Sequence, residues 1–295
     1  MILKNIWPLL KETFNAWNGE RTRTMAAALS YYTVFSFAPL LIIAMAITGQ
    51  VFGEADMQRY IFAQLQATIG QESAQTLFGM IKGAFKPSTG IIATVVGVAT
   101  LLLGAAIVFD QLQTSLNAIW EVKVKTRRFV TSLIRERLLS FLMILVVGAL
   151  LLMSLLVSTS LAALGHVLSG YMSELKFVFQ VLDFVVSVMI TTFLFAMIFK
   201  ILPDVKSQWN DVWIGAIATA LLFSIGKILI GMYLGIRSLA SAYGAAGSLV
   251  VLLLWVYYSA QIFFFGAELT HVYATKYGSD PSPDKNAVVV SNPPR

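Results

Sequence analysis

The sequence contains no cysteine, only two histidines, and charged residues at just 12% of its 295 positions. The absence of cysteine excludes disulfides, thiolate metal sites and a cysteine nucleophile. The sequence also lacks the GxxxxGK[ST] phosphate-binding loop, the GxSxG nucleophile motif and the HExxH zinc motif. Its carboxylates are mostly scattered singly, whereas a metal-dependent nuclease typically needs them clustered. These absences predict that the chain is not an enzyme and carries no metal and no cofactor.

Apolar residues dominate instead, at 58% of positions against about 45–50% in a typical globular domain, and the mean hydropathy is +0.77. They form six long runs. Each run can cross a hydrocarbon core of about 30 Å, which takes about 20 helical residues. We therefore predict an all-α, polytopic membrane protein, with six transmembrane helices in a single domain over residues 1–275. The predicted spans are residues 25–52, 90–117, 138–164, 179–202, 212–236 and 244–270.

Basic residues are distributed unevenly between the segments that connect these spans. The N-terminus, segments 118–137 and 203–211, and the C-terminus hold most of the Lys and Arg residues. Because cytoplasmic segments of membrane proteins are enriched in Lys and Arg, both termini are predicted to be cytoplasmic. The net charge of +6 would also suit a nucleic-acid partner, but the cations are dispersed rather than gathered in one stripe, so none is predicted. His166 and His271 then fall near opposite faces of the membrane and cannot share a metal ion.

Four segments outside the spans have patterns of their own. Residues 3–17 repeat apolar side chains at helical spacing, which predicts an amphipathic helix that lies on the cytoplasmic membrane surface or packs on the protein's own bundle. Residues 53–89 predict two short amphipathic helices on the outer face. The cations of segment 123–137 predict contact with anionic cytoplasmic lipid, or a topology signal alone. Residues 276–295 are rich in Pro, Ser and Asn, which predicts a disordered cytoplasmic tail.

Four ionisable side chains fall inside the predicted spans: Asp110, Asp183, Lys227 and Glu268. Burying such a group at the bilayer centre costs about 2.5–3.5 kcal/mol, so each is a candidate for function. Gln261 lies deeper in the same span as Glu268. At about 1.5 Å per residue, Asp183 and Lys227 reach matching depths, which predicts an ion pair. The five polar groups either fix the packing of the helices or line a substrate path.

The inner end of the first span is unusually polar. Ser30, Tyr31 and Tyr32 precede Pro39, and hydroxyl groups can satisfy the backbone groups that a proline frees. A kink lined by hydroxyls predicts a cavity wall, while hydrogen bonding between neighbouring helices would explain the same residues.

Two long segments, AAALSYYTVFSFAPLL at 26–41 and YGAAGSLVVLLLWVYYSAQIFFFGAELTHVYA at 243–274, resemble the signatures of the YihY/virulence factor BrkB family, and LNAIW at 116–120 fits as well. The resemblance covers residues 5–275 and implies a six-span protein of the bacterial inner membrane. Family members have been labelled ribonuclease BN, which this sequence does not support, and some relatives are associated with transport of envelope lipids. The residues that match the family pattern are Ser30, Tyr31, Tyr32, Pro39, Tyr243, Gly244, Gly247, Ser248, Gly266 and Glu268.

These observations favour a transporter or flippase-like protein that handles a lipid or another amphipathic envelope molecule without ATP. The alternative is a non-catalytic membrane scaffold that supports envelope integrity, and the third hypothesis is a ribonuclease acting on tRNA. The predicted partners are membrane lipids, including anionic lipid at the cytoplasmic face, and a homo-oligomer is compatible with the sequence.

Overall fold

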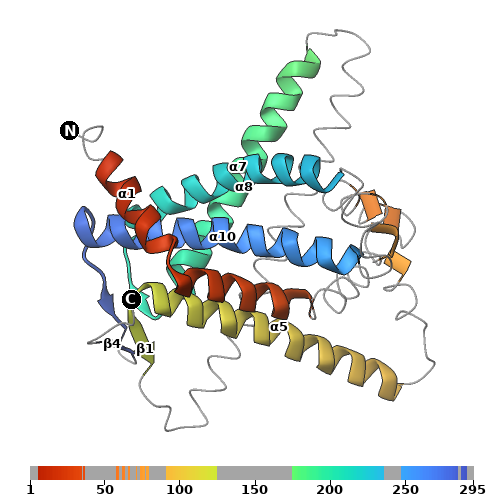
Figure 1. The fold of residues 1–295 in the computed structure, drawn as a ribbon, viewed down its shortest axis with the longest axis horizontal. Coiled ribbons are helices and arrows are strands. Elements are labelled where there is room, and N and C mark those ends of the chain that lie inside the picture. Colours follow the sequence, from red (N-terminus) through yellow and green to blue (C-terminus); the bar gives the residue numbers. More distant parts are fainter. Residues whose placement is uncertain are drawn as a thin grey trace. The chain divides into compact units, whose positions relative to one another are not determined.

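The computed structural model describes residues 6–34 and 36, scattered positions between 58 and 79, and residues 91–124, 175–235, 247–284 and 287–290. Five long helices dominate it (Figure 1). They are α1 (Ile6–Trp17), α5 (Ile91–Ile119), α7 (Leu175–Ile201), α8 (Trp209–Gly235) and α10 (Gly247–Lys276). Residues 20–34 are also helical. Four short strands complete the described elements: β1 (Val122–Val124), β2 (Val205–Lys206), β3 (Ser282–Pro283) and β4 (Ala287–Val289).

The helical architecture predicted from the apolar runs is confirmed. Helices α5, α7, α8 and α10 coincide with four of the six predicted spans, and α1 confirms the predicted N-terminal helix. Within the described residues, three helical segments are long and apolar enough to cross a membrane: Phe177–Ile201, Trp209–Lys227 and Leu249–Lys276. The third predicted span, most of the first one and the greater part of segment 53–89 lie outside the described residues. The count of six therefore stays a prediction.

Local chemistry explains where these helices begin and end. Pro203 follows α7 closely, and proline cannot continue a helix because it lacks the backbone N–H. Asp211 lies in the first turn of α8, where a negative charge complements the helix dipole. Glu121 ends the turn after α5 with a φ of 54°, the left-handed conformation that commonly terminates a helix.

The chain divides into two compact units. Unit 1 comprises Met1–Ala16, Leu116–Leu222 and Phe265–Pro294, and unit 2 comprises Trp17–Ser115 and Phe223–Phe264. In unit 1 the fully buried side chains include Leu116, Phe199 and Val212. In unit 2 they include Val251, Leu252 and Phe264.

The prediction of a disordered tail is wrong for the parts of residues 276–295 that the structure describes. Strand β4 pairs with β1 in antiparallel register, with Val122 opposite Val289 and Val124 opposite Ala287. Strand β3 pairs with β2, with Val205 opposite Pro283. A composition poor in apolar residues predicts disorder because it cannot bury enough surface, but here Ala287 is 5% exposed and joins a small core with Trp120, Val122, Val205 and Ala274.

Candidate functional site

The ends of several helices meet in unit 1 around residues 277–290, a segment that we call the C-terminal clasp. Its strands pair with β1, which follows α5, and with β2, which follows α7. The backbone N–H of Val290 donates to the carbonyl oxygen of Glu121, and that of Asp284 donates to the carbonyl oxygen of Asp204. Just before the clasp, Lys276 donates to Glu12 of α1. These contacts gather α1, the ends of α5, α7 and α10, and the start of α8.

A pair of hydrogen bonds links the end of α5 to the segment between α7 and α8. The Asn117 amide nitrogen donates to the Asp204 carboxylate over 2.6 Å, and the Asp204 backbone N–H donates to the Asn117 amide oxygen over 2.8 Å. Asn117 is buried, at 7% exposed. Because one side chain satisfies both a donor and an acceptor of Asp204, it fixes the spacing between two helix ends.

The first turn of α8 is held to the clasp by a buried carboxylate. Asp211 accepts hydrogen bonds from the backbone N–H and the hydroxyl of Ser279. Gly278 approaches so closely that a Cβ there would overlap the Asp211 carboxylate and lie 2.8 Å from the Ala274 Cα. Only glycine fits this approach without a backbone shift.

Helices α8 and α10 pack tightly through small residues in unit 1. A Cβ on Gly215 would overlap the Thr270 hydroxyl, and a Cβ on Gly266 would overlap the Thr219 hydroxyl. Both threonines are fully buried and donate along their own helices, Thr219 to Gly215 over 2.6 Å and Thr270 to Gly266 over 2.8 Å. Since residue numbers rise along α8 as they fall along α10, the two helices are antiparallel here. Small residues four apart on both helices are typical of close packing in membranes.

Glu268, one of the predicted site residues, lies on α10 next to an aromatic contact in unit 1. Its residue is 8% exposed, and its carboxylate lies 3.9 Å from Nδ1 of His271, which is too far for a direct hydrogen bond. The His271 ring meets Trp120 edge to face, with centroids 5.1 Å apart. A buried carboxylate, an imidazole and an indole thus lie together near the end of α10.

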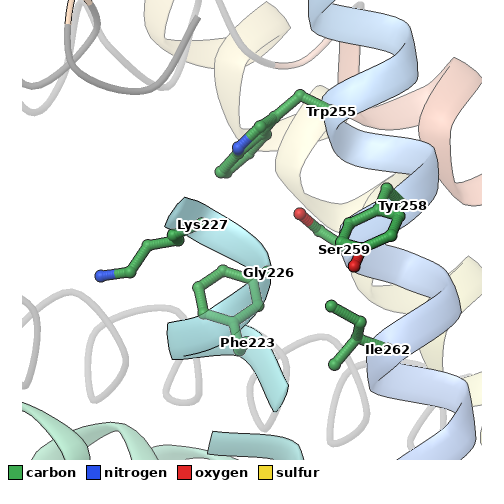
Figure 2. Close-up of a pocket in the computed structure, with 7 residues that line it drawn as sticks. All are labelled: Phe223, Gly226, Lys227, Trp255, Tyr258, Ser259 and Ile262. Carbon is green, nitrogen blue, oxygen red and sulfur yellow. The ribbon is translucent and has the colours of Figure 1, made fainter. Parts of the chain in front are cut away.

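Unit 2 contains a shallow recess between α8 and α10, which as it stands has no room for a water molecule. Figure 2 shows Lys227 on α8 extending away from α10, while Trp255, Tyr258 and Ser259 of α10 line the other wall. The remaining lining residues are Phe223, Gly226 and Ile262. The Lys227 side chain is exposed, so its cation lies at the rim of an aromatic and apolar surface.

Unit 2 also holds the described part of the hydroxyl-rich first span. Ser30 is buried and donates to the Ala26 carbonyl oxygen over 2.7 Å. Tyr31 and Tyr32 are exposed, and their rings meet edge to face at 5.6 Å. Pro39 lies outside the described residues, so its proposed kink stays a prediction.

The Gln261 side chain in unit 2 donates to the Tyr257 hydroxyl over 2.9 Å. The backbone carbonyl oxygen of Gln261 accepts a hydrogen bond of 2.9 Å from Nε1 of Trp17, the last residue of α1. Gln261 therefore joins α10 to the N-terminal helix, a structural contact that its position in the sequence did not indicate.

The remaining predicted polar residues are distributed between the units. Asp110 is exposed on α5 in unit 2. Asp183 is half-buried on α7 in unit 1, and one of its carboxylate oxygens is buried and has no hydrogen-bond partner among the described residues. The predicted pair of Asp183 with Lys227 joins residues of different units, and it stays a prediction. Across the described part of the chain, no three His, Asp or Glu residues gather in a way that could hold a metal ion.

Sequence reasoning missed the polar residues that hold the clasp, namely Asn117, Asp204 and Asp211. They flank the spans, where placing a polar side chain costs little free energy. Their positions in the sequence therefore do not distinguish them from ordinary polar residues of the connecting segments. The α8–α10 contact had a signal, because glycine and threonine occur four residues apart at Gly215–Thr219 and again at Gly266–Thr270.

The chain matches the virulence factor BrkB family over residues 13–290. A UPF0761 membrane protein of Rhodospirillum centenum is 28% identical over 86% of this chain and 54% of its own length. A UPF0761 membrane protein of Idiomarina loihiensis is 28% identical over 88% of this chain and 89% of its own length. The corresponding protein of Aggregatibacter aphrophilus is 26% identical with the same coverage.

This chain spans about half the length of some of the curated relatives that it matches. No solved structure matches it. The family match extends from α1 to the clasp and so includes almost every contact described above. The chain belongs to the virulence factor BrkB family and is an integral membrane protein.

Proposed function

We propose that this chain is a multi-pass protein of the bacterial inner membrane that moves an amphipathic envelope molecule, such as a lipid, across or within the bilayer without hydrolysing ATP. Both termini lie in the cytoplasm in this proposal. The contacts of the clasp support it, because α1, β1, β2, the start of α8 and the tail are the segments that the topology assigns to one side. An even number of spans follows from such an arrangement.

The observation that carries the transport proposal is the recess of unit 2. An anionic lipid needs an apolar surface for its acyl chains and a cation for its head group. Trp255, Tyr258 and Ile262 supply the surface, and Lys227 supplies the cation at its rim. A lysine inside an apolar helix is costly unless its amine reaches a partner, and a lipid phosphate is a suitable one.

Proteoliposomes that contain a phospholipid with a fluorescent acyl chain test the proposal. A reductant added outside bleaches only the outer leaflet, so transport appears as loss of the protected fluorescence. We expect the purified protein to accelerate this loss, Lys227→Met to abolish the acceleration and Lys227→Arg to retain it. Lys206→Met, which removes an exposed cation of unit 1, is the matched control. Normal transport activity of Lys227→Met would exclude the recess as the site of lipid transport.

A membrane scaffold is the second candidate, and the close α8–α10 packing in unit 1 favours it. In a scaffold Lys227 would pair with Asp183 rather than with a substrate. Removing one partner of an ion pair leaves the other charge uncompensated, while replacing both partners is milder. A double-mutant cycle of Asp183→Asn and Lys227→Met in nanodisc melts separates the two, because strong coupling without lipid transport supports the scaffold.

We further propose that the chain is not an enzyme and that nucleic acid is not its partner. The lack of catalytic motifs and the dispersed cations of the sequence support this view over cleavage of tRNA. Incubating the purified, metal-supplemented protein with tRNA tests it, and cleavage that co-purifies with the wild-type protein would contradict it.

A further inference from the structure

Helix α1 exposes large apolar side chains that a soluble surface would normally bury. Trp7 is 75% exposed, Phe14 50%, and Ile6 and Leu10 are each 39% exposed. In contrast, Thr13 of the same helix is fully buried. The helix therefore packs on unit 1 with a side that differs from its most apolar one.

The positions around the helix explain this division. At about 100° per residue, Ile6, Leu10, Phe14 and Trp7 form one exposed apolar arc. Thr13, which faces the protein, lies about 20° from Ile6 at one edge of this arc and about 120° from Trp7. On the other side, Lys11 lies about 40° beyond Trp7 and is exposed.

The position of α1 relative to a membrane span identifies what the apolar arc meets. Glu12 accepts a hydrogen bond from Lys276, the last residue of the span Leu249–Lys276. With this segment across the bilayer, α1 is held beside the end of α10, close to where the helix leaves the membrane. With 12 residues, α1 is about 18 Å long, so its exposed arc can lie along the head-group region at this level.

The side chains fit the interface between lipid and water. Tryptophan favours the head-group region of a bilayer, and a lysine beside it can contact lipid phosphates. The alternation of an apolar arc with a basic flank is characteristic of helices that lie in the plane of a membrane. If the arc bound a second protein instead of lipid, nothing would require it to lie at the end of a membrane-spanning helix.

We propose that α1 is an interfacial helix that inserts Ile6, Trp7 and Leu10 into the leaflet where α10 ends, with Lys11 contacting anionic head groups. This surface is independent of the proposed transport site, which lies in unit 2. Its role is to anchor the N-terminus of the protein to the membrane surface and to bind anionic phospholipid there.

Site-specific labelling tests the proposal, because the chain has no cysteine of its own. Leu10→Cys and Asn15→Cys are placed singly in the full-length protein and labelled with an environment-sensitive fluorophore. Both positions are exposed on α1, but they lie about 140° apart around the helix. In nanodiscs that contain lipids with a nitroxide near the head group, the label at Leu10→Cys should lose its emission while the label at Asn15→Cys keeps it.

Two outcomes would overturn the proposal. Equal quenching at both positions would mean that the arc does not face lipid selectively. A blue-shifted label at Leu10→Cys that lipid does not quench would mean that a protein, such as a second copy of the chain, covers the arc. Ile6→Cys, on the same arc, repeats the test if the first variant misfolds. Adding anionic lipid should increase the quenching of the Ile6→Cys label, and Lys11→Gln in that background should lose this increase; an unchanged increase would refute the role of Lys11.

Discussion

The contact between Gly266 and Thr219 permits a direct test of the packing between α8 and α10. Gly266→Ala adds one methyl group, which would overlap the Thr219 hydroxyl and lie 3.0 Å from the Thr219 Cβ and 3.2 Å from the Gly215 carbonyl oxygen. None of these atoms is the end of a flexible side chain. Thr219 is branched at Cβ and fully buried, and its hydroxyl is already bonded to Gly215. The helices must therefore separate to admit the methyl group.

Two opposing effects set the change in the free energy of unfolding that Gly266→Ala causes. Overpacking a well-packed core typically costs about 1–3 kcal/mol. Alanine is also a better helix former than glycine by about 1 kcal/mol, which offsets part of the cost. Gly104→Ala isolates the second term, because its new Cβ would meet Ser36 no closer than 3.4 Å, an ordinary contact. Gly266→Ala should therefore be about 1–3 kcal/mol less stable than Gly104→Ala.

Unfolding of the purified protein in nanodiscs or mixed micelles measures this difference. The double variant Gly266→Ala/Thr219→Ala removes the overlapping hydroxyl, so it should recover much of the loss and give a coupling energy in a double-mutant cycle. Equal stability of Gly266→Ala and Gly104→Ala would refute the reasoning, because the two helices would then be free to adjust at this contact.

Three further predictions concern topology, the clasp and the buried carboxylate. With cysteines placed at the exposed Gln71 and Gln208, an impermeant thiol reagent added to intact cells should label the first and not the second; the reverse would contradict the proposed topology. Asn117→Ala removes both hydrogen bonds between Asn117 and Asp204, so the free energy of unfolding should fall by about 1–3 kcal/mol. An unchanged melting temperature would show that Asn117 does not hold the clasp. Glu268→Gln should insert normally but fail to complement a deletion strain under envelope stress, and full complementation would exclude a role for its charge.

The long helices could be predicted because their signal is local. Helices α7, α8 and α10 each contain a segment that is long and apolar enough to cross a membrane, and a run of this length and composition is a signal within neighbouring residues. Helix α1 was predictable from its 3.6-residue periodicity. These properties depend on neighbouring residues and not on how the chain folds back on itself.

The clasp could not be predicted, because its strands are short and pair with segments that are distant in the sequence. Strands β3 and β4 contain only two and three residues, too few for an alternating pattern to emerge. Their partners, β1 and β2, lie far away in the sequence. The order of this segment depends on a few specific hydrogen bonds and on the burial of Ala287, which composition does not capture.

Depth in the membrane was also an incomplete guide to the site. Counting residues along a helix gives the depth of a side chain but not the direction in which it points. Lys227 extends away from α10 (Figure 2), and Asp110 is exposed, whereas Glu268 is buried. The rotation of α8 against α10 in unit 1 follows from the small residues at their contact, Gly215 and Gly266, and these carry information that the charged residues lack.

The contacts of α8 with α10 differ in kind between the two units, and the difference bears on function. In unit 1, Gly215 and Gly266 meet carbonyl oxygens and buried threonines, which cannot move without shifting a helix. In unit 2, Gly226 meets the Cδ1 of Ile262 and a ring carbon of Tyr258. These atoms are at or near the ends of side chains that can change rotamer, and both side chains line the recess. The recess can therefore widen by rotamer changes of these side chains, as the proposed lipid transport requires, while the packing beside the clasp stays fixed.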